Sequence, residues 1–434
     1  MKSTRSTIYA GAFSVLLAVM CLYSAGEAVA QRKGFNYDEA KVPKYTLPDP
    51  LVLSDGSRVT DSEMWRTKRR GELLSLFKEH VYGAMPPPLP IARVDYNDFE
   101  VDGLGGKGSR REVTLFFNKD RSGPKIRVLI LMPKQTRDNW PFPAFLGYNF
   151  NGNHTVHADK KIRMSKVWER KPGSTPQWPD EETRGASASR WQVEKIIARG
   201  YALVTVYYGD VDPDFHDGFK NGVHALYPDY QNRGDNWTSI GGWAWGLSRV
   251  LDFLEKEDLI DAKRVAVIGH SRLGKTSLWT GASDERFAMV ISNDSGCGGA
   301  ALARRRFGET VARINTSFPH WFCTNHKKYN DNENAMPVDH HELIALIAPR
   351  PVYVASAQED KWADPRGEFL SCVGADPVYR LLGYEGMPTK TWPSVNQPVH
   401  GRIGYHVRSG KHDVTEFDWG QYLDFADRHM RGKK

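Results

Sequence analysis

Hydrophobic residues recur along this chain in two patterns, one typical of buried strands and the other of amphipathic helices. Short runs rich in β-branched and aromatic residues predict strands at residues 113–117, 126–132, 143–148, 201–207, 265–268, 287–292, 351–356 and 389–395. Apolar positions three and four residues apart predict helices at residues 61–82, 191–199, 240–253, 341–346 and 416–430. Because strands and helices alternate from residue 126 onward, we expect a mostly parallel sheet with helices on both faces.

Polar stretches without periodicity separate these elements and set the expected domain organisation. Residues 31–48 predict an extended arm, and residues 155–190 and 209–237 predict long surface insertions. The sequence contains no internal repeat and no convincing linker. We therefore expect a single α/β domain over residues 31–434, built as a three-layer sandwich around the sheet.

The first 30 residues have the pattern of a cleavable secretory signal peptide. A positively charged start precedes an apolar stretch at residues 10–22, which is too short for a comfortable membrane span. Small residues at 28 and 30 fit a cleavage site before Gln31. No other segment is apolar enough to cross a bilayer. We therefore expect a protein that is secreted or exported to the periplasm.

Charge and composition narrow the expected partners. The formal net charge is +7, and removal of residues 1–30, which contain Lys2, Arg5 and Glu27, would leave +6. That excess favours acidic polymers such as uronate-bearing polysaccharides. No nucleic-acid-binding motif accompanies it, so nucleic acid is not expected as a partner. Thirteen tryptophans could stack on sugar rings, although packing in the core is the commoner use of this residue.

Cysteine and histidine spacing gives no sign of a structural metal site. Cys21 would leave with the signal peptide, and Cys297, Cys323 and Cys372 allow at most one disulfide, whose pairing stays open. Residues 339–342, Asp-His-His-Glu, invite a metal interpretation. Adjacent histidines point to different sides of a helix, so we expect a surface or supporting role there and no metal or cofactor.

The candidate nucleophile is Ser271, within Gly-His-Ser-Arg-Leu-Gly at residues 269–274. A predicted strand precedes it and a helical pattern follows, which is typical of the nucleophile elbow of α/β-hydrolases. The turn lifts the hydroxyl above the sheet, and glycines leave room for it. The second glycine comes one residue later than in the usual Gly-x-Ser-x-Gly. A chance match is the alternative, but the strand-turn-helix context favours the nucleophile and the α/β-hydrolase fold.

A serine hydroxyl needs a base, which in this fold follows the acid late in the chain. His400, His406 and His412 are the late histidines, and we favour His412 because it lies just before the final helix. Asp294 and Asp360 both follow strands beyond the elbow. We slightly favour Asp360, which occupies the usual acid position, as the group that orients the imidazole.

Two features could stabilise the negative charge of a tetrahedral intermediate. Arg272 directly follows the serine, and a fixed guanidinium stabilises a developing oxyanion. The loop at residues 149–154 could supply a backbone donor, with a structural turn as an equal alternative. Lys275 lies one helical turn beyond Ser271 and therefore faces the same way.

Four blocks of sequence give this chain a family resemblance. Residues 269–279, Gly-His-Ser-Arg-Leu-Gly-Lys-Thr-Ser-Leu-Trp, resemble the nucleophile motif of the glucuronoyl esterases, carbohydrate esterase family 15. Residues 293–300, 358–365 and 409–415 continue the resemblance in the family's order, and His412 stands at the position of the family's histidine. The resemblance covers most of the mature chain and is closest to the bacterial branch.

The resemblance also implies roles for further residues. Arg272 would assist the oxyanion, and Lys275, Glu309 and Trp362 would hold the glucuronoyl ring. A salt-bridged pair for Lys275 and Glu309, and simple packing for Trp362, are the alternatives. At Asp294 the family usually has Glu, so this chain departs from it by one methylene, and family members differ in which of the two acid positions serves.

We therefore expect a monomeric, exported serine esterase that forms an acyl-enzyme. Its expected substrate is the ester between 4-O-methyl-glucuronoyl groups of glucuronoxylan and lignin alcohols. An esterase of another carbohydrate ester, such as acetyl-xylan, is one alternative, and a catalytically silent polysaccharide-binding protein is another. Turnover of a methyl glucuronate ester separates the three.

Overall fold

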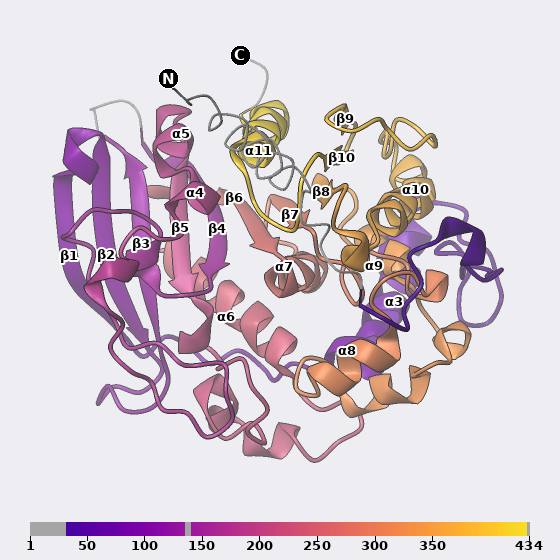
Figure 1. Cartoon of the computed structure of the whole chain (residues 1–434), viewed down its shortest axis with the longest axis horizontal. Helices are drawn as coiled ribbons and strands as arrows, with labels where there is room; N and C mark the ends of the chain where they lie inside the picture. The colour runs from indigo at the N-terminus through magenta and orange to yellow at the C-terminus, as the bar shows by residue number, and fades with distance from the viewer. Residues whose placement is uncertain (1–31, 135–139, 432–434) are drawn as a thin grey trace, which may run out of the picture. The chain divides into compact units, whose positions relative to one another are not determined.

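A mixed sheet of ten strands forms the centre of residues 36–434, which make one compact unit (Figure 1). The computed structural model describes residues 32–134 and 140–431. The expected signal peptide lies outside these residues. The strand order is β1-β2-β3-β5-β4-β6-β7-β8-β10-β9. The strands are β1 Arg93–Gly103, β2 Gly108–Phe116, β3 Lys125–Pro133, β4 Phe142–Asn149, β5 Ala202–Tyr207, β6 Ile260–His270, β7 Met289–Asn293, β8 Val352–Ala357, β9 Val399–His400 and β10 Ile403–Arg408.

The central six strands, from β5 to β10 in sheet order, run parallel, whereas β1, β2, β3 and β9 pair with their neighbours in antiparallel fashion. Parallel neighbours require crossover connections, and the helices supply them. The helices are α2 Ser62–Met64, α3 Arg70–Phe77, α4 Ala188–Trp191, α5 Val193–Ala198, α6 Ser239–Leu254, α7 Arg272–Ser283, α8 Val311–Ser317, α9 His340–Ala345, α10 Pro365–Leu381 and α11 Glu416–Met430.

Alternating side chains of the central strands enter two separate hydrophobic cores. In β4, Ala144 and Leu146 join the core that contains α6, α7, α9 and α10, whereas Phe145 joins the core that contains α5 and α11. All three side chains are buried. A strand covered on both faces is apolar at successive positions, which is why the sequence shows continuous runs there. The expected three-layer α/β architecture is confirmed.

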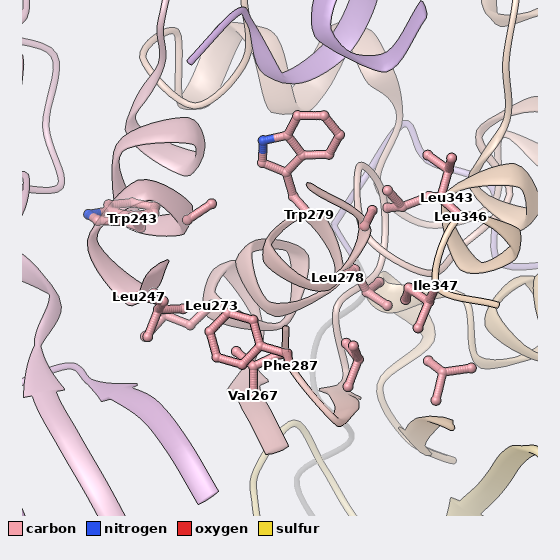
Figure 2. Close-up of a cluster of buried hydrophobic side chains, with 14 of the residues drawn as sticks. Trp243, Leu247, Val267, Leu273, Leu278, Trp279, Phe287, Leu343, Leu346 and Ile347 are labelled. Carbon is pink, nitrogen blue, oxygen red and sulfur yellow. The ribbon is translucent and has the colours of Figure 1, made fainter. Parts of the chain in front are cut away.

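Helix α7 lies in the middle of the larger core, and this packing fixes the element that carries the candidate nucleophile. Figure 2 shows Leu273 and Leu278 of α7 between Trp243 of α6 on one side and Leu343 of α9 on the other. Each of these side chains is at most 1% exposed. Burial of one such side chain is worth about 1.5–3 kcal/mol, so α7 has little freedom to move against the sheet.

Several elements differ from the prediction. Residues 389–395 form no strand, because Pro393 lacks a backbone donor and the place beside β8 belongs to the fully buried β10. The helix expected at residues 191–199 is divided into α4 and α5 by Gln192, whose φ is 43°. β1, β10 and α10 were not predicted. β1 is an edge strand with mostly half-buried and exposed positions, so its apolar signal is weak.

The structure also tests the expectations for the cysteines and for residues 339–342, because all of these residues are buried. Cys297, Cys323 and Cys372 are buried and free. The surface role expected for residues 339–342 is wrong, because all four are buried. Asp339 caps α9 and forms an ion pair with Arg304. Among the described residues, no helix is long and apolar enough to cross a membrane.

Candidate active site

Ser271 occupies a strained turn between β6 and α7, as the elbow motif predicts. Its φ is 59° and its ψ is −126°, a conformation that a residue with a side chain adopts only when the surroundings enforce it. A Cβ at Gly269 would lie 1.8 Å from the carbonyl oxygen of Leu273, so only glycine fits there. The Ser271 N–H donates to the carbonyl of Asn293, 2.9 Å away, and ties the turn to the end of β7.

The candidate base and acid come from the ends of two other parallel strands. His412 follows β10 and Asp360 follows β8. The Nδ1 atom of His412 lies 2.5 Å from Oδ2 of Asp360, a hydrogen-bonded ion-pair geometry. The carboxylate side chain is 7% exposed and the imidazole 41%. With Nδ1 donating to the acid, the neutral ring carries its lone pair on Nε2, the nitrogen that a general base uses.

His270 places the base beside the elbow. Its ring centroid lies 4.4 Å from that of His412, and its own Nδ1 lies 2.6 Å from Oδ1 of Asn293. Burial, and then the charge of His412, hold the pKa of His270 well below its usual range, so this ring stays neutral. Within the described residues, Ser271 Oγ makes no hydrogen bond, and such bonds often tighten only when substrate binds.

Arg272 begins α7 and forms an ion pair with Asp214 through Nη1. Its side chain is 18% exposed, so part of it remains accessible at the site. A cation held beside the nucleophile is suited to stabilising an oxyanion. Asp214 lies in the insertion at residues 209–237 and was not singled out from the sequence.

Lys275 and Glu309 lie close enough for the charge of one to affect the pKa of the other. Lys275 is buried, and its Nζ donates to the carbonyl of Ser295 and lies 5.9 Å from the centroid of the Trp321 ring. Burial lowers the pKa of Lys275, and the negative charge of Glu309 opposes that shift. The Glu309 N–H donates to the carbonyl of Trp362 at 3.0 Å. The three residues predicted to bind the sugar therefore share one region beyond the elbow.

Comparisons with known proteins show the family of this chain. A family model described as glucuronyl esterase, fungi, matches residues 186–383. The solved structure of a promiscuous CE15 esterase from a marine bacterial metagenome is 52% identical, covers 92% of this chain and 100% of that one, and has a TM-score of 0.83. The chain belongs to carbohydrate esterase family 15.

Two further relatives extend the comparison. A glucuronoyl esterase from Solibacter usitatus is 48% identical in sequence, with 90% of this chain and 99% of that chain covered and a TM-score of 0.86. The 4-O-methyl-glucuronoyl methylesterase 1 of Wolfiporia cocos is 28% identical over 79% of this chain and 74% of that protein. The α/β-hydrolase fold expected from the sequence is that of the family 15 structures.

In this family 15 esterase, Asp294 lies near the base without contacting it through a hydrogen bond. Its φ is 44°, and its Oδ1 accepts from the N–H of Ala357 at 2.7 Å. The other oxygen is buried and lies 3.5 Å from Nη2 of Arg408. Burial, followed by the charges of Asp360 and Glu368, raises the pKa of Asp294 well above its usual range. The acid bonded to the imidazole is thus Asp360.

Asp294, Asp360 and His412 also form a group whose possible ligand atoms lie within 4.8 Å of one another, the one such group in residues 32–134 and 140–431. An acid–histidine hydrogen bond already uses the imidazole Nδ1 and one carboxylate oxygen. An acid and base next to an elbow serine explain this group without a metal ion. The expectation that no cofactor is needed stays a prediction.

The other two late histidines, His406 and His400, make contacts that support the fold. His406 is buried, with Nε2 2.8 Å from Oδ1 of Asp418 and Nδ1 2.9 Å from the hydroxyl of Tyr353. His400 packs on Phe425, with ring centroids 6.2 Å apart. Neither ring is bonded to Asp294 or Asp360, so His412 alone of the three meets a candidate acid.

The loop at residues 149–154 folds as a local turn. Oδ1 of Asn149 accepts from the N–H of Gly152 at 2.8 Å, and residues 153–155 form a single 3₁₀ turn. The ring of Phe150 lies 5.8 Å from Cζ of Arg272. The loop therefore reaches the oxyanion side of the elbow, and its role as a backbone donor stays a prediction.

One further buried group of this family 15 esterase escaped sequence reasoning. Glu368 of α10 accepts from the N–H groups of Ser295 and Gly296, both at 2.9 Å, and from the hydroxyl of Ser356 at 2.6 Å. Burial raises the pKa of Glu368 to about 7. Nothing in the sequence marks this glutamate, because α10 was not predicted and its partners lie 12 and more than 70 residues away.

Proposed function

We propose that this esterase hydrolyses the ester between 4-O-methyl-glucuronoyl groups of glucuronoxylan and lignin alcohols. The observation that carries the proposal is the Asp360–His412 hydrogen bond beside the strained elbow of Ser271. The name of the Wolfiporia cocos relative, a 4-O-methyl-glucuronoyl methylesterase, supports the acyl group. The net positive charge of the chain suits an acidic polysaccharide.

Acylation begins when Nε2 of His412 takes the proton of Ser271 Oγ and the oxygen attacks the ester carbonyl carbon. The resulting oxyanion lies beside the guanidinium of Arg272, which stabilises the charge. His412 then returns the proton to the leaving alcohol, and the carbon–oxygen bond to that alcohol breaks. Asp360 keeps the imidazole in the correct tautomer and stabilises its charged form.

Deacylation repeats these steps with water as the nucleophile. His412 removes a proton from the water, the hydroxide attacks the acyl carbon, and the proton passes to Oγ of Ser271 as the uronate leaves. Every proton that enters the imidazole thus leaves it within the same half-reaction, so the enzyme returns to its starting state.

The region beyond the elbow would bind the uronoyl ring. Lys275 and Glu309 offer donors and acceptors suited to sugar hydroxyls, and Trp362 offers an apolar face. Lys275 and Glu309 have opposite charges, so their mutual attraction keeps both near the elbow before substrate arrives. We further propose that the protein is exported and acts as a monomer.

The test is a panel of methyl glucuronate, methyl galacturonate and acetylated xylan with the unmodified protein and with Ser271→Ala. The unmodified protein should prefer the glucuronate ester, and the variant should lose several powers of ten in kcat with an unchanged Tm. Ser283→Ala is the matched control, because Ser283 ends the same helix and its Oγ donates only to helix carbonyls.

Two outcomes would replace the proposal. Preference for acetyl esters would indicate an acetyl-xylan type of esterase. Binding of glucuronoxylan without turnover of any ester would indicate a polysaccharide-binding protein. Near-normal activity of Ser271→Ala would exclude the mechanism.

A further inference from the structure

The guanidinium of Arg272 is enclosed by one carboxylate and three aromatic rings, a set that we call the arginine box. Its Cζ lies 4.9 Å from the ring centroid of Trp321, 5.7 Å from that of Phe318 and 5.8 Å from that of Phe150. Asp214 completes the box through the ion pair with Nη1. Cations within about 6 Å of an aromatic ring are attracted to its face, so the box favours one placement of the guanidinium.

Asp214 is itself held from several directions. Its side chain is 1% exposed. One carboxylate oxygen accepts from Nε2 of His320 at 3.1 Å and from Nε1 of Trp321 at 2.8 Å. The other accepts from Arg272 and from the hydroxyl of Tyr208 at 3.1 Å. A carboxylate with four donors cannot rotate to follow a moving guanidinium, so it acts as a fixed anchor.

The same contacts keep the carboxylate of Asp214 ionised. Burial alone would raise the pKa of its carboxyl, but the hydrogen bond from His320 and the charge of Arg272 outweigh it and hold the pKa below its usual range. The carboxylate is therefore ionised whenever the enzyme works. A buried charge is retained only where its partners satisfy it, and here one of those partners is the residue next to the nucleophile.

The ion pair uses only part of the guanidinium. Within the described residues, the side chain of Arg272 makes its hydrogen bond through Nη1, and Nε is buried without a partner. Five N–H donors are available on an arginine, so donors remain for a substrate oxygen. Oxyanion stabilisation depends on donors that are already in place when charge develops, because reorganisation during the reaction costs rate.

We propose that Asp214 is a positioning residue for catalysis, which acts on the oxyanion only through Arg272. The inference rests on the proposed function, since it requires Arg272 to stabilise the intermediate. Asp214 and Phe150 come from the loops after β5 and β4, 58 and 122 residues before Arg272. Phe318 and Trp321 come from the segment after α8, 46 and 49 residues after Arg272. The position of the Arg272 guanidinium, which stabilises the oxyanion, is thus set by loops outside the elbow motif.

The test is a double-mutant cycle on the full chain with a methyl glucuronate ester. Arg272→Ala should lower kcat by about 10²–10³, the scale of losing one oxyanion donor. Asp214→Asn should lower kcat by about 10–100-fold with KM changed by less than about twofold, because the guanidinium is still present but no longer fixed. In the Arg272→Ala background, Asp214→Asn should have almost no further effect on kcat, since its route to the reaction is gone.

A control separates positioning from general loss of a buried ion pair. Arg111 and Glu257 form a pair at 2.5 Å with exposures of 18% and 5%, close to those of Arg272 and Asp214, but on β2 and after α6. Glu257→Gln should change the Tm by an amount comparable to Asp214→Asn and leave kcat unchanged. A purely structural role for Asp214 predicts that both variants behave alike.

If Asp214→Asn does not fold, Tyr208→Phe replaces it, because it removes one donor to the same carboxylate oxygen and keeps the ring. This variant should lower kcat by about two- to tenfold in the unmodified protein and not at all in Arg272→Ala. The inference is overturned by equal losses from Asp214→Asn in both backgrounds, by an effect on KM alone, or by normal activity of Arg272→Ala. In that last case, inactivity of Ser271→Ala would leave the proposed function standing.

Discussion

At the scale of single residues, two aspartates near His412 have opposite electrostatic situations. Asp360 is hydrogen-bonded to the imidazole, whereas Asp294 is buried, faces two other acids and has its pKa raised well above the usual range. A raised pKa disfavours the negative charge with which a carboxylate stabilises an imidazolium. The two positions that the sequence left open therefore differ in their contact with the imidazole.

Asp360→Asn should lower kcat by about 10⁴, as removal of the charged acid does in the serine-protease template. Asp294→Asn should lower kcat by less than about tenfold, because Asp294 makes no hydrogen bond to the imidazole and the amide oxygen can still accept from Ala357 N–H. Steady-state kinetics on a methyl glucuronate ester would measure both. A larger loss from Asp294→Asn than from Asp360→Asn would contradict the assignment.

At the scale of elements, Glu368 joins three parts of the fold beneath the site. It extends from α10 and accepts from the turn after β7 through Ser295 and Gly296 and from β8 through Ser356. The same turn supplies the carbonyl that accepts from Lys275. One buried carboxyl thus connects the strand ends that carry Asp294 and Asp360 with the helix that covers them.

This glutamate should make the stability of the protein depend on pH. The unfolded chain releases the Glu368 proton near pH 4.5 and the folded chain near pH 7, because burial raises the folded pKa. Between these values the folded state binds more protons, so the free energy of unfolding should fall as pH rises, by on the order of 3 kcal/mol. Glu368→Gln keeps the amide oxygen as acceptor and should remove this part of the slope.

Urea unfolding at pH 5 and pH 7 would measure the difference between the two proteins. Exposed Glu182→Gln is the control and should retain the slope of the unmodified chain. An identical pH dependence in Glu368→Gln and the unmodified protein would exclude Glu368 as its source.

Elements with strong periodicity were predictable, and those fixed by distant partners were not. The strands at residues 126–132 and 143–148 are largely apolar because both faces are covered, with Arg127 as the charged exception, so β3 and β4 could be located from sequence. β10 pairs with β8 over six residues, yet its sequence, Ile-Gly-Tyr-His-Val-Arg, buries His406 and Arg408 against Asp418. Those polar positions hide a central strand until its partner is known.

The same reasoning applies to the site. Ser271, Asp360 and His412 could be found because each follows a predictable strand or precedes a predictable helix. Asp214 and Glu368 could not, because their roles depend on contacts made across 58 and 73 residues of chain. A sequence motif reports the local backbone around a residue. The distant side chains that hold that residue in place are known only from the tertiary fold.

At the scale of the whole molecule, the signal-like N-terminal sequence predicts that the protein is exported. Expression of the full chain in a bacterium with a general secretion pathway should yield a protein that begins at Gln31, because residues 28–30 form a small-x-small site. N-terminal sequencing or intact mass measurement would detect the loss of 30 residues. Replacing Ala28 and Ala30 with Leu should block processing, and a protein that retains Met1 without that change would contradict the prediction.

The location of Asp214 bears on how such enzymes can be recombined. The insertion at residues 209–237 contributes no strand to the sheet, so it resembles a surface segment that could be replaced without changing the fold. Yet this segment contains the anion that anchors the cation beside the nucleophile. Exchanging it with the equivalent segment of a relative would alter turnover number along with substrate range, so chimaeras intended to change selectivity should transplant Asp214, Arg272 and their aromatic neighbours together.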